Sequence, residues 1–172
     1  MRHLCALFAS LSLAAVAHAD SGQADPAHAD SGEVVLKVEQ AVALLRDHGD
    51  AALAALRDPH GRFVWKDTYV FVVNCDDDIV VSNPAFPERV GGDIKQHTDY
   101  AGKQYGLELC RTASRPGGGW IEYVWLPPGT DTPKRKLSFV RSVPGRPYQV
   151  GAGVYDHSTA EPHRYQELRS DN

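Results

Sequence analysis

Apolar residues recur at helical spacing from Glu33 to Leu56. This spacing predicts an amphipathic helix, because residues three and four positions apart share one helix face. The polar run from Asp47 to Asp50 includes a glycine, so we predict a bend or break there. Asp58–Gly61 contains proline and glycine and ends the element. The apolar positions are Val34, Val38, Val42, Leu45, Leu53 and Leu56.

From Tyr69 onward the pattern changes to β-branched and aromatic runs separated by turn residues. Tyr69–Val73 and Ile79–Val81 are predicted to form a hairpin across the polar turn Asn74–Asp78. Three further strands in meander order follow, because proline and glycine form the turns between them. A helical segment beside one antiparallel sheet predicts an α+β domain. The three later strands are Trp120–Trp125, Lys136–Val143 and Tyr148–Tyr155.

The segment between the hairpin and the third strand lacks a single period. Glu88–Tyr100 reads as a structured loop, and Ala101–Ser114 as a short helix with Tyr105 and Leu109 one turn apart. Pro116–Gly119 breaks that helix. We expect this long excursion to roof one face of the sheet and to form a pocket there.

The chain begins with the basic pair Arg2-His3, an apolar run from Leu4 to Val16, and the small residues Ala17 and Ala19 around His18. This arrangement is typical of a cleavable signal peptide. The run is shorter than the ~20 residues needed to cross a bilayer. We expect export to the periplasm or secretion, with no membrane insertion after cleavage; a buried N-terminal helix is the alternative.

The hexapeptide AHADSG occurs at Ala17 and again at Ala27. If both copies can be cut, the mature chain starts at either Asp20 or Asp30; the alternative, which we favour, is a short duplication within a disordered leader. Polar, proline-containing surroundings give His18 and His28 no fixed geometry for a metal. The expected organisation is a signal peptide at 1–19, a disordered leader at 20–32, one domain at 33–155 and a polar tail at 156–172.

The formal net charge is −4, which argues against a nucleic-acid partner, since such proteins need clustered basic residues. The basic run Lys134–Lys136 is interpreted as a solvated strand edge. Without Cys5 two cysteines remain, Cys75 and Cys110, and in an oxidising compartment they favour one disulfide. Two separately buried thiols are the alternative. Their spacing excludes a redox CxxC motif or a zinc cluster.

Alternation places Ile121, Tyr123 and Trp125 on one face of the third strand. One face must pack on the N-terminal helix, and the other can line a cavity. Aromatic walls with a few polar groups are typical of small-molecule pockets, although the aromatics can equally fill a core. A buried lysine or paired tyrosine hydroxyls would suit a carboxylate. Polar candidates are Tyr69, Asn83, His97, Asp99, Tyr123, Lys136 and Tyr155.

Catalytic motifs are not found. There is no Gly-x-Ser-x-Gly elbow, and Gly117–Gly119 lacks the Lys-Ser/Thr ending of a phosphate loop. Asn74–Asp78 imitates only the start of a calcium loop. His157 and His163 have no third ligand and are interpreted as surface residues. We predict no enzyme activity, no cofactor and no metal site.

A series of short motifs follows from Asp67 to Tyr155. They are DxYxFV at Asp67, NP at Asn83, VG at Val90, DxxGK at Asp99, GGWxxYxW at Gly118 and VxxGxY at Val150. In this order and spacing they resemble the single Cache domain of the second type, found outside the membrane in bacterial chemoreceptors and sensor kinases. The resemblance covers roughly Val34 to Tyr155.

The resemblance implies a PAS-like five-stranded antiparallel sheet with a long N-terminal helix. It also implies a pocket between the sheet and the connector after the second strand, often for small organic acids. The chain departs from the family at Asn83, where a histidine is usual, and at Cys75–Asp78, which replaces an Asp-x-x-Gly turn. Carried over by position, the pocket residues are Tyr69, Asn83, Tyr123, Trp125, Lys136 and Tyr155.

The function expected is binding of a small organic acid or similar metabolite by an exported, free-standing sensory module. The family's flanking transmembrane helices and output module are missing, so a membrane receptor or sensor kinase is the expected partner. A protein-interaction module whose pocket is filled by its own side chains is one alternative. The other is a small hydrolase that uses His97 and Asp99 as an acid/base pair.

Overall fold

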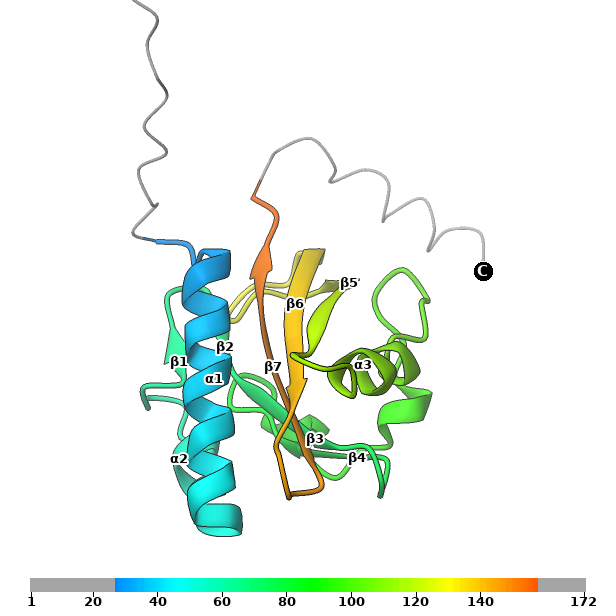
Figure 1. Cartoon of the computed structure of the whole chain (residues 1–172). Coiled ribbons are helices and arrows are strands. Elements are labelled where there is room, and N and C mark those ends of the chain that lie inside the picture. Colours follow the sequence, from blue (N-terminus) through cyan, green and yellow to red (C-terminus); the bar gives the residue numbers. More distant parts are fainter. Residues whose placement is uncertain (1–26, 158–172) are drawn as a thin grey trace, which may run out of the picture.

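The structure, a computed structural model, describes residues 27–157 and arranges them in three layers (Figure 1). The helix α1 (Ser31–His48) covers one face of an antiparallel sheet, and α3 (Gly106–Ala113) lies on the other face. No helix among these residues is long and apolar enough to span a membrane. The predicted signal peptide, the first part of the leader and most of the C-terminal tail lie outside the described residues.

The capping residues of α1 explain where this helix begins. The side chain of Asp30 accepts the Glu33 N–H at 2.8 Å, and the Glu33 carboxylate accepts the Asp30 N–H. This reciprocal pair is a capping box. The helix therefore begins at Ser31 and not at Glu33, and the predicted disordered leader is wrong for its last residues.

The predicted break after α1 is confirmed. Gly49, with a φ of 56°, ends α1, and a 3-10 turn, η1 (Gly49–Ala52), leads into α2 (Leu53–Arg57). A φ in this left-handed region favours glycine. The Asp47–Asp50 segment therefore divides one amphipathic pattern into two helices that bury their apolar residues on the same side.

The five-stranded antiparallel sheet is also confirmed, with strand order β4-β3-β7-β6-β5. The last strand within the described residues, β7, lies at the centre and pairs with both β3 and β6. The strands are β3 (Phe71–Asn74), β4 (Ile79–Ser82), β5 (Gly119–Trp125), β6 (Lys134–Ser142) and β7 (Tyr148–Tyr155).

The predicted strand Tyr69–Val73 is divided between two ladders. Tyr69 belongs to β2 (Thr68–Tyr69), which pairs with β1 (Val64–Trp65) in a small separate ladder. The strand β3 begins at Phe71 and pairs with β4 and β7. The run of strand-forming residues is continuous, but its pairing partner changes at Val70, which the sequence pattern alone does not reveal.

The connector, residues 83–105, joins β4 to α3 and contains two 3-10 turns, η2 (Pro87–Arg89) and η3 (Ile94–Gln96). The predicted helix Ala101–Ser114 begins later, at Gly106. The Asp99 side chain accepts the backbone N–H groups of Ala101 and Lys103, which holds that stretch in a turn instead of a helix.

Both faces of the sheet are buried. Alternate residues of β3 and β7 pack under α1, and the remaining ones pack under the connector and α3. The α1 side contains Val70, Val72, Phe139, Val150 and Ala152, and the connector side contains Phe71, Val73, Ile121, Tyr123, Trp125 and Val140.

A disulfide joins Cys75 and Cys110, with the two Cα atoms 5.9 Å apart. Cys75 follows β3 at the hairpin turn, and Cys110 lies in α3. The bond therefore ties the edge hairpin of the sheet to the helix that covers the connector side.

We predict that the Cys75→Ser/Cys110→Ser double variant is less stable than the wild type. The cysteines are 35 positions apart, and opening a loop of this length lowers the free energy of unfolding by about 4 kcal/mol on the chain-entropy model. Urea denaturation with and without a reductant measures the effect. Reduced wild type should match the double variant. Equal stability of the oxidised wild type and the variant would contradict the prediction.

Candidate functional site

A cavity lies between the sheet and the connector. It encloses about 360 Å³ of space that no atom fills, part of it open to solvent. The centres of water-sized molecules fit within about 30 Å³ of this space. Since one water needs roughly 10–15 Å³ by this measure, the cavity suits a small molecule. It is lined by Tyr69, Phe71, Val73, Val80, Asn83, Arg89, Ile94, His97, Tyr105, Leu109, Tyr123 and Trp125.

Stacked aromatic rings form one wall of this cavity. The ring of Tyr105, at the start of α3, lies parallel to that of Tyr123 in β5, with centroids 4.5 Å apart. Trp125 meets both tyrosines edge-on, at 5.6 and 6.0 Å. Offset and edge-to-face contacts of this kind are favourable beyond the area they bury. The wall is therefore held in place by contacts among its own residues.

The connector supplies the two basic side chains of the cavity lining, Arg89 and His97. The guanidinium of Arg89 lies 4.4 Å from the centre of the Trp125 ring, a cation–π contact that orients its fork. No ion pair between Arg89 and a carboxylate is found in residues 27–157. An oriented arginine without an acidic partner is suited to a bound anion.

His97 is the second ionisable group of the lining. Burial lowers the pKa of His97, and repulsion by the nearby Arg89 lowers it further. The imidazole is therefore biased toward its neutral form while no anion is close. A negative charge placed between Arg89 and His97 would offset the repulsion by Arg89 and favour the charged form of the imidazole.

Four of the six predicted pocket residues line the cavity: Tyr69, Asn83, Tyr123 and Trp125. Their hydroxyl and amide groups already have contacts within the protein. Tyr123 shares a hydrogen bond of 3.0 Å with Ser138, and Asn83 Oδ1 accepts the Phe86 N–H at 3.0 Å. Burial raises the pKa of Tyr69 and of Tyr123 well above that of a free tyrosine, so both hydroxyls stay protonated.

The other two predicted residues, Lys136 and Tyr155, lie outside the lining. Tyr155 donates its hydroxyl to the Leu126 carbonyl at 2.9 Å. The Nζ of Lys136 is buried, has no hydrogen-bond partner among the described residues, and lies 4.3 Å from the centre of the Tyr69 ring and 4.6 Å from that of Tyr155. The solvated-edge interpretation is therefore wrong for Lys136, which is fully buried.

Asp99 is not paired with His97 as an acid and base. One oxygen of its carboxylate accepts the N–H groups of Ala101 and Lys103, and the other accepts the Val124 N–H at 2.8 Å. The side chain thus fastens the connector to β5. Because both oxygens accept backbone N–H groups, Asp99 does not form the acid/base pair with His97 on which a hydrolase would depend.

Sequence reasoning missed Arg89 and gave Tyr105 no role in the pocket. Both belong to the irregular connector, where no hydrophobic period shows which side chains point inward. His97 was among the polar candidates but not among the residues carried over by resemblance. The only sequence signal for Arg89 is its place directly before the Val90-Gly91 motif.

Residues 59–160 match the family model described as a Cache domain, which is more than half of the chain. The chain belongs to the Cache domain family. Cache domains are sensory modules and not enzymes, in agreement with the class predicted from the motifs.

A curated relative of this Cache domain is the sensor histidine kinase MctS of Rhizobium johnstonii. It is 39% identical over 90 residues, which are 52% of this chain and 19% of that protein. The chain therefore spans about a fifth of the length of this relative.

Solved structures share the fold. The periplasmic sensor domain of a chemotaxis protein is 30% identical, with a TM-score of 0.56 over 69% of this chain and 85% of that one. A Cache chemosensory domain that recognises a carboxylic acid is 22% identical, with a TM-score of 0.62 over 73% and 92%. A methyl-accepting chemotaxis protein from Vibrio parahaemolyticus is 19% identical, with a TM-score of 0.61 over 72% and 86%.

We predict that Lys136 makes the free energy of unfolding depend on pH in the neutral to alkaline range. Burial lowers its pKa to about 7 in the folded protein, against ~10.4 in an unfolded chain. The unfolded state therefore binds more protons between these values, so the free energy of unfolding rises with pH, by on the order of a few kcal/mol from pH 7 to 9.5. Urea denaturation at both pH values measures this rise.

The matched variants are Lys136→Met, which should lose the rise, and Lys103→Met, an exposed lysine, which should keep it. The same pH dependence in the wild type and Lys136→Met would show that the buried ammonium is not its source.

Proposed function

We propose that this Cache domain is a periplasmic sensory module that binds a small carboxylic acid in the cavity between sheet and connector. The proposal rests on Arg89, a cation that stacks on Trp125 in a lining made mostly of aromatic and aliphatic side chains. A planar guanidinium can bind a carboxylate through two parallel hydrogen bonds.

The rest of the lining supports the same ligand class. His97 provides a second donor near Arg89, while Val73, Val80 and Leu109 provide apolar contacts for a short hydrocarbon chain. The limited volume favours a short acid over a long or bulky one. Recognition of a carboxylic acid by a Cache domain of the same fold adds support for the class of ligand.

The alternative of a protein-interaction module with a filled pocket has less support. A cavity is present beside Tyr123, with polar side chains from the connector facing it. We propose instead that the bound acid is reported to a membrane signalling protein. This part rests on the likeness to a sensor histidine kinase and to a periplasmic chemotaxis sensor, and on the signal-like first nineteen residues.

We predict that short carboxylates raise the thermal midpoint of the protein. A ligand at a hundred times its Kd adds ~2.7 kcal/mol to the free energy of unfolding. Acetate, propionate, pyruvate, lactate and succinate at millimolar concentration form the screen, with the matching amides and chloride as controls. The shift should disappear in Arg89→Ala and persist in Arg111→Ala, an exposed arginine of α3. A carboxylate that stabilises Arg89→Ala as much as the wild type would refute this site.

We further predict that binding takes up a proton at His97. A bound carboxylate attracts the imidazolium and neutralises Arg89, so it raises the pKa of His97 from its lowered value. Affinity should therefore increase as pH falls from 7.5 to 5.5. Calorimetry in two buffers of different ionisation enthalpy measures the proton uptake. His97→Gln should bind without it, whereas proton release by the wild type would contradict the assignment.

A further inference from the structure

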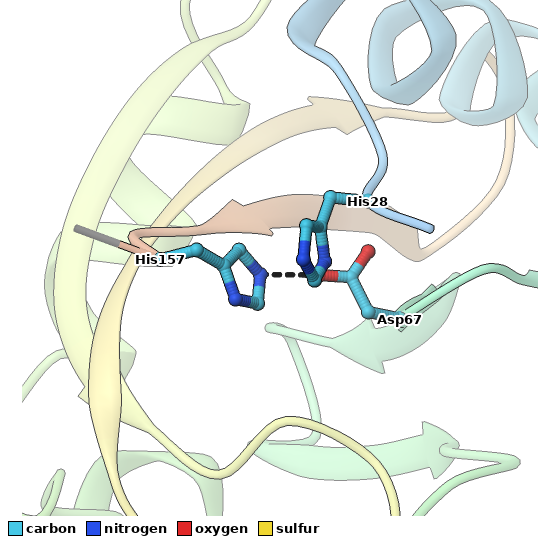
Figure 2. A group of neighbouring side chains, drawn as sticks. All are labelled: His28, Asp67 and His157. Atoms are coloured by element: carbon cyan, nitrogen blue, oxygen red, sulfur yellow. Dashed lines mark hydrogen bonds and ion pairs between the residues drawn. The ribbon is translucent and has the colours of Figure 1, made fainter. Parts of the chain in front are cut away.

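Three side chains from distant parts of the chain meet in one cluster (Figure 2), and none of them is among the residues that line the cavity. His28 precedes α1, Asp67 lies between β1 and β2, and His157 follows β7. His28 was expected to have no fixed geometry, and His157 to be a surface residue with no third ligand. Asp67 corrects both expectations, because its carboxylate contacts both imidazoles, and His157 is only partly exposed.

The Asp67 carboxylate is the centre of this cluster. Its Oδ2 lies 3.1 Å from His28 Nδ1 and 2.7 Å from His157 Nε2. The two imidazole rings stack with their centroids 3.4 Å apart. The other oxygen, Oδ1, accepts the Ala29 N–H at 2.8 Å, which fixes the orientation of the carboxylate.

We propose that His28, Asp67 and His157 bind a divalent transition metal ion of the zinc class. Two imidazole nitrogens and one carboxylate oxygen are the donor set preferred by such ions. Bound at ~2.0–2.1 Å in tetrahedral geometry, donor atoms lie roughly 3.4 Å apart. The three donor atoms here lie within 4.8 Å of one another, so small movements would admit the ion and leave a fourth position for water.

One of the hydrogen bonds in this cluster competes with metal binding. Lys134 Nζ lies 2.9 Å from His157 Nδ1. An ammonium group only donates, so Nδ1 accepts and the proton of His157 sits on Nε2, facing Asp67. A metal ion would take the place of this proton, and Lys134 would have to release Nδ1. Lys134 therefore opposes metal binding in two ways: its hydrogen bond to His157 Nδ1 must break, and its positive charge repels the metal ion.

The position of the site gives it a structural consequence. The start of α1 and the end of β7 lie at the same end of the molecule (Figure 1), and the three ligands connect the segments that flank both. A bound ion would fasten these two ends to the β1–β2 turn. The site also depends on export processing: a mature chain that starts at Asp20 keeps His28, and one that starts at Asp30 loses it.

The test is a titration of the chelator-treated protein, shown by mass spectrometry to retain His28, with Zn²⁺ and with Co²⁺. We expect one ion per chain by calorimetry and visible Co²⁺ bands with the intensity of a four-coordinate site. His157→Ala and Asp67→Asn should each weaken binding at least tenfold. His60→Ala, an exposed histidine, is the matched control and should bind as the wild type does.

Lys134→Met distinguishes a metal site from a hydrogen-bonded contact alone. It should tighten Zn²⁺ binding several-fold, because it frees His157 Nδ1 and removes a positive charge. The proposal is overturned if the wild type binds no ion at equimolar Zn²⁺. It is equally overturned if binding survives in the His28→Ala/His157→Ala double variant, since other residues would then hold the ion.

Discussion

The sheet of this Cache domain is buried on both faces, and this double burial determines how the helices and the connector are arranged. Residues that alternate along β3 and β7 must fill two separate cores, one under α1 and one under the connector. The central strand β7 leaves no room for bulk at Gly151, where a Cβ would lie 2.3 Å from the Phe71 ring. The connector side can therefore keep a cavity only where other elements prevent its collapse.

Three contacts position the connector and α3 above the sheet and leave space beneath them. The disulfide ties α3 to the β3–β4 turn, and Asp99 fastens the connector to β5. At Gly106 the helix α3 lies so close to the connector that a Cβ at this position would be 1.9 Å from the Ile94 carbonyl oxygen. The stacked pair Tyr105 and Tyr123 then forms a rigid wall, and the space beside Arg89 remains open to a ligand.

Much of the fold could be predicted, because alternation along strands and helical spacing are local properties. They located the break after α1 and the five strands, whereas the family resemblance assigned Tyr123 and Trp125 to the pocket. Transfer by position gives no depth, so Lys136 was also assigned to the pocket although it lies outside the lining. Arg89 was missed because the connector has no period. His28 and His157 contact Asp67 across 39 and 90 positions, which no local pattern can show.

If the cavity between sheet and connector receives a carboxylate, a crystal structure of the protein with the most stabilising acid of the thermal screen will show it. We expect density inside the lining, with the carboxylate in hydrogen-bond contact with Arg89 and its hydrocarbon part against Leu109 and Val80. Ligand density elsewhere on the molecule, or an Arg89 that points away from the bound acid, would contradict it.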